Sequence, residues 1–401
     1  MEHSSTLTPP AERLEWAKRA VAVTFLANGM AFGSWASRTP AVKAVLHLDA
    51  SGLGLLLICI SIGSLTALPL SGPLVHLVGA GRAVLVSAAA EVSGFGVAAA
   101  GLSASRVELT GAGLVLAGLG IGTWDVAMNV EGAAVERWLG RSVMSRFHAG
   151  WSLGSVAGAG LGAVCAGIGV GVATQLVVTA VLIAVLAAVG ASRYLAFEPH
   201  PQRSEPGRSK ALLGAGWRDR RTLFIGLMVL AFAFTEGVAN DWMAVAVVDG
   251  FDSSDAVGAI GFGCFVVAMT LTRLVGGSAL DRWGRLVVLR SSVFVAAAGV
   301  LVVVTSPFLV LAMAGGLLWG VGTALGFPTG MSAAADDVPR AAIQVSVVSS
   351  IGYTAFLAGP PLVGFLGDAF GIRNALYVVL AALVLGLVTT AHARPLPDGM
   401  R

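Results

Sequence analysis

Apolar segments of about 20 residues alternate with short polar turns along most of the chain, from residue 20 to residue 393. A segment of this length and composition is typical of a helix that crosses a lipid bilayer. The pattern predicts six such helices before residue 194 and six more after residue 221. Their predicted ranges are 20–43, 52–78, 82–103, 108–133, 143–168, 171–193, 222–248, 255–280, 285–305, 307–332, 341–368 and 372–393.

One turn sequence occurs twice. The sequence GSALDRWGR at 277–285 has a degraded copy, GPLVHLVGAGR, at 72–82, and the two copies stand 205 residues apart, about half of the 401-residue chain. Such internal repeats are typical of two related membrane units. The sequence therefore predicts an all-α membrane protein with twelve transmembrane helices in two pseudo-symmetric six-helix bundles. The expected parts are a cytoplasmic N-terminal segment (1–19), the first bundle (20–193), a cytoplasmic central linker (194–221), the second bundle (222–393) and a cytoplasmic tail (394–401).

The composition supports a lipid environment. Hydrophobic residues make up 56% of the chain and charged residues only 12%, and the mean hydropathy is +0.85. A soluble protein of this length with this composition would have too few polar residues to cover its surface. The 53 glycines fit helices that associate in lipid through close backbone contact. Cys59, Cys165 and Cys264 each lie inside a predicted helix, so we expect small buried side chains and neither a disulfide framework nor a metal site.

The basic residues predict the orientation of the helices. With both termini in the cytoplasm, roughly twenty of the basic residues fall on the inner side. Four fall near outer ends: Arg38, Lys43, Arg106 and Arg373. The segment before Val21 is polar and lacks the apolar core of a secretory signal, so we expect the first helix to remain in the mature protein.

Two halves of six helices, a basic central loop and a G-x-x-x-D-R-x-G-R turn together resemble the major facilitator superfamily, over nearly the whole chain. The segments FHAGWSLG (147–154), DVAMN (125–129) and EGVANDW (236–242) further resemble the YbjJ-type, fucose-permease-related bacterial branch. The resemblance implies a multi-pass protein of the bacterial inner (cell) membrane. It also implies alternating access, in which two bundles rock about a central site near the midplane.

The repeated turns are candidate gates. An acid at one helix end can meet the basic groups of its neighbours in only one conformational state. We therefore expect Asp281, Arg282 and Arg285 to gate the second half. In the first half, the candidate gate residues are His76 and Arg82, and His76 stands where the acid should be, which predicts a weaker or pH-dependent gate. The alternative is that both turns only cap and orient helices.

Acids inside the predicted helices are candidates for proton coupling, because a charge at a helix centre costs on the order of 3 kcal/mol on insertion scales. Glu236 lies near the middle of its helix in what we expect to be an apolar cavity, with Asp241 five residues further on. Asp125 and Asn129 share one helix face, and His148 at similar depth could pair with Asp125. In each case the alternative is a fixed hydrogen bond between helices.

A further set of side chains suits a polar solute that contains a ring. Asn28 and Trp35 are seven residues apart and so lie on one helical stripe, and Trp242 is the positional counterpart of Trp35 in the second half. Arg38 could attract an anionic group or could extend to the outer surface. The predicted substrate-binding residues are Asn28, Trp35, Arg38, Asn129, Asn240 and Trp242.

Other classes of function leave weaker traces. GWSLG at 150–154 matches the G-x-S-x-G pattern of a serine nucleophile, which makes an intramembrane serine protease using Ser152 a rival, although no strand precedes the motif. The three lysines do not form a phosphate-binding loop, which excludes that route to ATP-driven pumping. A drug or metabolite exporter and a solute sensor that does not transport stay open.

The interpretation that fits best is a proton-coupled secondary transporter that moves a small polar organic solute, sugar-like or related, by alternating access. We expect no enzyme activity, no cofactor, no metal and no nucleic-acid partner. The expected partners are the solute, protons and the lipid bilayer, and we expect a monomer. The identity of the substrate and the direction of transport stay open.

Overall fold

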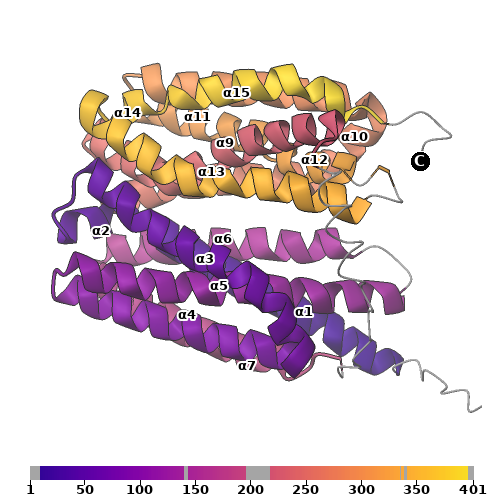
Figure 1. Ribbon diagram of the computed structural model, residues 1–401. Helices are drawn as coiled ribbons and strands as arrows, with labels where there is room; N and C mark the ends of the chain where they lie inside the picture. The colour runs from indigo at the N-terminus through magenta and orange to yellow at the C-terminus, as the bar shows by residue number, and fades with distance from the viewer. Residues whose placement is uncertain (1–9, 140–142, 196–216, 335, 338–340, 396–401) are drawn as a thin grey trace, which may run out of the picture. The chain divides into compact units, whose positions relative to one another are not determined.

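The computed structural model describes residues 10–139, 143–195, 217–334, 336–337 and 341–395, and in these ranges the regular elements are all helices (Figure 1). The helices of the first half are α1 (Ala11–Ala36), α2 (Thr39–Val45), α3 (Ala50–Val78), α4 (Ala80–Ser103), α5 (Val107–Leu139), α6 (Met144–Gly167) and α7 (Val172–Ala191). Those of the second half are α9 (Arg220–Phe251), α10 (Asp255–Thr305), α11 (Leu309–Thr323), α12 (Gly326–Ala334), α13 (Ala341–Phe370), α14 (Ile372–Ala375), α15 (Val378–Thr389) and the 3₁₀ helix η2 (Thr390–Ala393).

Within the described ranges, ten helices are long and apolar enough to cross a membrane. The 51-residue α10 counts as one of the ten, although its backbone leaves helical geometry at Gly284 (φ 76°, ψ 157°). A straight helix of that length would be about 76 Å long at 1.5 Å per residue, more than twice the hydrocarbon thickness of a bilayer. Helix α1 is not among the ten. Twelve crossings in two bundles therefore stay a prediction.

Three predicted helices prove to be interrupted, and one of them is 372–393, which is divided among α14, α15 and η2. The segment predicted as 20–43 is divided between α1, which begins at Ala11, and the short helix α2, which has Pro40 in its first turn. Proline fits there because the first amides of a helix have no partner within the helix. The segment predicted as 307–332 is divided between α11 and α12, which are separated by Ala324 and Leu325.

The contacts divide the described chain into two compact units. Unit 1 contains the described parts of Met1–Trp35, Cys59–Leu161 and Gly169–His200. Unit 2 contains those of Ala36–Ile58, Gly162–Ile168 and Pro201–Arg401. The helix α2 and the start of α3 therefore belong with the second half of the sequence. The predicted domain borders around 194–221 stay a prediction.

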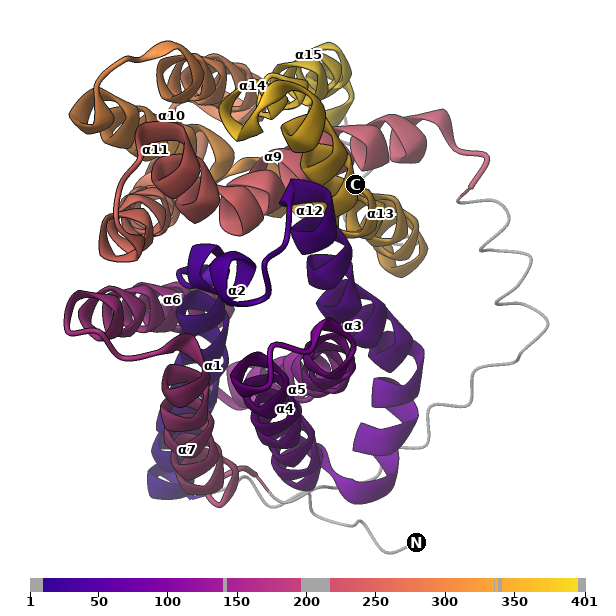
Figure 2. The same ribbon diagram turned by 90° about the vertical axis from the view of Figure 1, so that its left-hand side faces the viewer.

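In unit 1, glycines let α1 and α6 touch along their backbones. A Cβ atom added to any of four glycines would lie about 2 Å from a carbonyl oxygen of the other helix, so only glycine permits this separation. The four pairs are Gly29 with Trp151, Gly33 with Ser155, Gly154 with Leu26 and Gly158 with Met30. On another side of α1, Gln175 of α7 donates to the Ser34 hydroxyl (2.9 Å) and to the Ser34 carbonyl (3.1 Å). Helix α4 packs against both α5 and α7 (Figure 2).

In unit 2, α9 is the central helix and packs against α13, α15, α10, α12 and α11. Most of its length is buried, including the ring of Trp242. Near the chain end of this unit, Arg373 donates to the carbonyls of Gly250 (3.4 Å), Val304 (2.7 Å) and Ser306, and so satisfies the C-terminal ends of α9 and α10.

Candidate functional site

Glu236 of α9 forms an ion pair with Arg273 of α10. The Arg273 Nη2 atom lies 2.9 Å from Oε1 and 2.8 Å from Oε2 of Glu236. The two side chains are largely buried, with 14% of Glu236 and 25% of Arg273 exposed. The apolar setting expected for Glu236 is therefore wrong, because a basic residue from the neighbouring helix lies against it.

The same arginine reaches the break between α11 and α12. Arg273 Nε donates to the Ala324 carbonyl at 3.1 Å, and this carbonyl lies where α11 has ended and α12 has not begun. Trp319 of α11 donates through Nε1 to the Thr235 carbonyl of α9 (3.2 Å). One charged pair thus joins α9, α10 and an interrupted helix, a combination that can respond to a change of charge.

The side chains of the three predicted site residues that follow Glu236 lie on different faces of α9. Asn240 follows by one helical turn and so shares the face of Glu236. Asn240 is buried, and its Oδ1 has no hydrogen-bond partner among the described residues. Asp241 is half-buried and lies about 140° around the axis of α9 from Glu236. Trp242 is fully buried, and its Nε1 also has no partner within the described parts.

In unit 1, Asn28 of α1 meets an aromatic residue that the sequence analysis did not select. Trp151 of α6 donates through Nε1 to the Asn28 Oδ1 atom at 2.8 Å. The Trp151 ring also lies against Phe32, with ring centroids 5.4 Å apart and planes inclined by 31°. Trp35, predicted as the aromatic partner on the Asn28 stripe, is buried near the end of α1.

Asp125 and Asn129 bond to each other within α5. The Asn129 amide donates to the Asp125 carbonyl (2.8 Å) and to its Oδ1 (3.2 Å). His148 lies edge-on against Phe25 of α1, with ring centroids 5.1 Å apart. The predicted shared face of Asp125 and Asn129 is confirmed, and the pairing of His148 with Asp125 stays a prediction.

At one end of unit 2, a cluster around Asp336 joins three segments. Arg285 Nη1 lies 2.8 Å from both carboxylate oxygens of Asp336, and Arg221 Nη2 lies 2.9 Å from one of them. Arg282 stacks over the ring of Trp283, and Asp281 is exposed. The acid that meets Arg285 is therefore Asp336, whereas the sequence predicts Asp281 as the acid of this gate.

The corresponding turn in the first half is only partly visible. Arg82 is exposed near the start of α4. The side chain of His76 lies outside the described part, so its predicted role stays a prediction. Further along the first half, Glu136 accepts the backbone amides of Val143 (2.7 Å) and Met144 (2.8 Å) and so caps α6.

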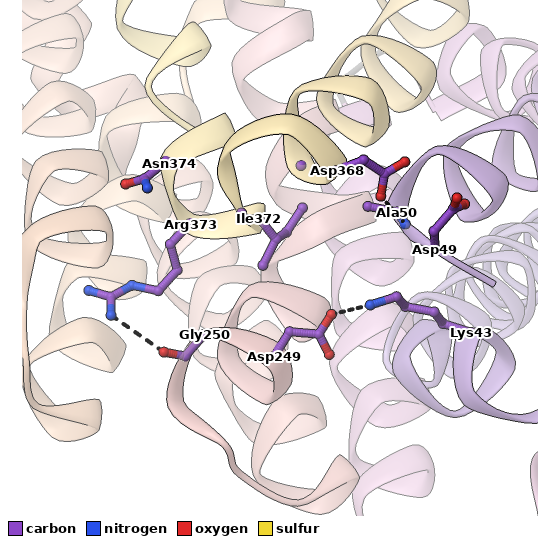
Figure 3. Close-up of a pocket in the computed structure, with 11 residues that line it drawn as sticks. Lys43, Asp49, Ala50, Asp249, Gly250, Asp368, Ile372, Arg373 and Asn374 are labelled. Carbon is purple, nitrogen blue, oxygen red and sulfur yellow. Dashed lines mark hydrogen bonds and ion pairs between the residues drawn. The ribbon is translucent and has the colours of Figure 1, made fainter. Parts of the chain in front are cut away.

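At the other end of unit 2, several charged side chains line a cavity (Figure 3). Its volume is about 500 Å³. Asp368 of α13 accepts the backbone amides of Ala50 (2.8 Å) and Ser51 (2.9 Å), and so caps the start of α3 from another helix. Lys43 of α2 pairs with Asp249 of α9 in the same view.

Arg38 lies just before α2 and is buried, with Asp255 as a charged neighbour. This burial does not fit a side chain that extends to the outer surface. Ser152, the serine of the G-x-S-x-G match, is buried in the interior of the continuous helix α6, so the strained turn that exposes such a nucleophile is missing there.

Comparison with known proteins identifies the family. The model of the Major Facilitator Superfamily matches residues 21–343 and 225–399. The chain belongs to the major facilitator superfamily. It is 36% identical over 370 residues to an uncharacterized transporter of Sinorhizobium fredii, a match that covers 91% of this chain and 96% of the relative. The chain is thus a multi-pass membrane protein of a transporter family.

Two solved superfamily structures have the same fold. The nucleoside transporter NupG superposes with a TM-score of 0.75 at 16% identity, over 94% of this chain and 98% of that chain. A variant of the E. coli fucose:proton symporter FucP superposes with a TM-score of 0.63 at 14% identity, with the same coverage. At these identities the two likenesses show the fold alone.

Several residues of this superfamily member were missed by the sequence analysis, for two reasons. Arg273 lies inside an apolar helix and could have been selected by the rule that had selected Glu236. Asp336 and Asp368 lie at helix ends, where acids are common, and only their partners in other segments mark them.

Glu91 is fully buried midway along α4, and its carboxyl oxygens have no hydrogen-bond partner in the described parts.

Proposed function

We propose that this protein is a proton-coupled secondary transporter of a small polar organic solute, with Glu236 as the proton-carrying residue. The observation that carries the proposal is the largely buried ion pair between Glu236 and Arg273. In a low-dielectric site each of the two charges stabilises the other. Protonation of Glu236 therefore leaves the Arg273 charge without its counter-charge. The fucose:proton symporter FucP, which has the same fold, gives a precedent for the reaction class.

The pair provides a physical reason for coupling. Removing one partner of a buried ion pair costs about 3–5 kcal/mol, and less where the side chains are partly exposed, as here. Protonation of Glu236 would have this cost unless another acceptor approached Arg273. A polar oxygen of the solute can be that acceptor. Proton and solute then bind well only together, and a proton moving down 100 mV supplies about 2.3 kcal/mol.

Alternating access is supported by a network at each end of unit 2 that can form or break. We assign the end with α2 and Asp368 to the outside and the end with Asp336 to the cytoplasm, in the bacterial inner membrane with both termini inside. Under this assignment Asp368 and Lys43 help to close the outer side, while Asp336 and Arg285 form the inner gate.

The test is proton flux in proteoliposomes that contain a pH-sensitive dye, across a panel of sugars, nucleosides, carboxylates and cationic drugs. We compare the parent protein with Glu236→Gln, which keeps the side-chain shape and cannot carry the proton. The matched control is Asp252→Asn, because Asp252 is an exposed acid at the end of the same helix and its left-handed conformation suits asparagine.

A solute-dependent proton flux in the parent and in Asp252→Asn, absent in Glu236→Gln although solute exchange persists, supports the proposal. An equal proton flux in Glu236→Gln refutes the role of Glu236. Solute uptake without proton movement in the parent refutes proton coupling and leaves a facilitator. Binding without uptake favours a sensor, and flux in the opposite sense favours an exporter.

A further inference from the structure

The crossing of α1 and α6 in unit 1 combines an amide with two aromatic rings, and all three side chains are uncharged. Asn28 and Phe32 are four residues apart on α1 and so share one face. Trp151 of α6 contacts both, through a hydrogen bond to Asn28 and a ring contact with Phe32. We call these three residues the ring half-site.

Hydrogen bonding fixes the orientation of the Asn28 amide. The indole Nε1 of Trp151 is only a donor, so the Asn28 atom that meets it at 2.8 Å must be the oxygen. The amide nitrogen of Asn28 then points elsewhere. It is buried and has no hydrogen-bond partner in the described parts of the chain, while 4% of the residue is exposed. A buried donor without an acceptor costs about 1–3 kcal/mol, so the site favours a ligand that brings an acceptor.

The aromatic side chains are held but not fully covered. Phe32 and Trp151 are both half-buried, unlike the fully buried Trp124 of the same unit. The glycine contacts of Gly29 and Gly154 set the distance between the two helices and therefore the position of the Trp151 ring over α1. Such a fixed, partly exposed ring offers its face for stacking at little entropic cost.

We propose that the ring half-site binds the neutral, planar ring of the transported solute, with a ring carbonyl or ring nitrogen accepting from the Asn28 amide. The proposal rests on the transport function proposed above, and it names the class of solute. The face of the ring stacks against Trp151 and Phe32. The absence of formal charge on the three side chains favours a neutral lactam or amide ring over an aromatic anion or cation.

Titration calorimetry on purified full-length protein in detergent tests the half-site without any proton gradient. The ring probes are nicotinamide and uridine, which carry a planar ring and a carbonyl acceptor. The matched probes are acetamide, which has the carbonyl acceptor without a ring, and ribose, which has the hydroxyl groups of uridine without the planar ring. We expect a Kd of about 1 mM or tighter for at least one ring probe, and binding at least about tenfold weaker for acetamide and ribose.

Three variants separate stacking from hydrogen bonding. Trp151→Leu should weaken binding of the ring probe at least about fivefold, the lower end of stacking contributions. Asn28→Asp keeps an acceptor for the Trp151 indole and removes the free donor, and should weaken binding about fivefold or more. Trp138→Leu is the control, because Trp138 is an exposed tryptophan near the end of α5, and it should bind as the parent does. Trp151→Phe, which keeps a ring, should bind between the parent and Trp151→Leu.

Each result bears on one proposal separately. If neither ring probe binds the folded parent, or if Trp151→Leu binds as tightly as the parent with an unchanged unfolding temperature, the half-site is refuted. This holds even if Glu236 carries a proton. If the ring probes bind with the expected ranking but drive no proton flux in proteoliposomes, the half-site stands and the coupling proposal fails. A loss of folding in Trp151→Leu leaves Asn28→Asp and Trp151→Phe to decide.

Discussion

The capping of α3 by Asp368 predicts that a single change at this position should open one end of unit 2. In the structure each carboxylate oxygen accepts one backbone amide, from Ala50 at 2.8 Å and from Ser51 at 2.9 Å. Asparagine offers one acceptor oxygen and no charge. Asp368→Asn therefore loses one of the two hydrogen bonds and the attraction between a carboxylate and the positive end of the helix.

The size of the effect follows from exposure. A hydrogen bond to a charged group contributes about 1.5–3 kcal/mol when buried, and the helix dipole adds about 0.3–1 kcal/mol. Asp368 is exposed, so water and salt screen both contributions. We expect a net loss of about 1 kcal/mol, which corresponds to about a fivefold shift of population away from the capped state. Asp368→Ala loses both acceptors and should shift the population further.

Lys43 provides the readout, because the chain has only three lysines, Lys18, Lys43 and Lys210. Lys43 pairs with Asp249 beside the capped helix (Figure 3). In this pair 21% of the Lys43 side chain is exposed. The assay is modification by an amine reagent that cannot cross the membrane, applied to intact cells and quantified on the Lys43 peptide by mass spectrometry. Labelling should rise about fivefold in Asp368→Asn and more in Asp368→Ala.

The matched control is Asp252→Asn, which removes another exposed acid of unit 2 and should leave the labelling of Lys43 unchanged. Equal labelling of Lys43 in the parent, Asp368→Asn and Asp368→Ala, with all three proteins folded, would refute the capping argument. Labelling of Lys18 from outside in intact cells would contradict the proposed cytoplasmic N-terminus instead.

Two predictions concern stability and are measured as thermal unfolding in one detergent. Gly158→Val should lower the free energy of unfolding by about 1–3 kcal/mol, because a Cβ there would lie 2.2 Å from the Met30 carbonyl oxygen. Gly160→Ala is the control, since a Cβ on this glycine of the same helix meets open space and should change the stability little. Equal stability of the two variants would contradict the backbone contact. Gly284→Ala should lower the free energy of unfolding by about 1–3 kcal/mol, because a backbone with φ 76° and ψ 157° is adopted almost only by glycine. Gly277→Ala, at a helical position of α10, should leave the free energy of unfolding unchanged or raise it by up to about 1 kcal/mol. A stable Gly284→Ala protein would mean that the two parts of α10 can join without this turn.

Much of the helical pattern was predictable because lipid permits few alternatives. A segment in hydrocarbon must satisfy its backbone internally, so a run of apolar residues of bilayer length forms a helix. The interruptions were harder to predict. The break between α11 and α12 contains no proline, and the Ala324 carbonyl is instead satisfied by Arg273 from another helix. Nothing in the local sequence of 323–326 indicates such a partner.

The candidate site was predictable where a residue is unusual by itself. Glu236 could be selected because an acid is rare inside an apolar helix. Its partner Arg273 is 37 residues away, and only the packing of α10 against α9 brings the two together. The spacing of seven residues correctly places Asn28 and Trp35 on one stripe of α1. The aromatic residue that contacts Asn28 nevertheless comes from α6, because glycines bring that helix into backbone contact.

The hydrogen bonds that Arg373 donates to the ends of α9 and α10 have a consequence for the biosynthesis of the protein. This one side chain satisfies carbonyl groups at Gly250 and Val304, which precede it by 123 and 69 residues. While the ribosome is still synthesising the intervening helices, the ends of α9 and α10 have no such donor and must rely on water or lipid headgroups. The second half of the chain therefore completes these contacts late in its biosynthesis, after residue 373 has emerged, and a chain that stops earlier leaves both helix ends without this donor.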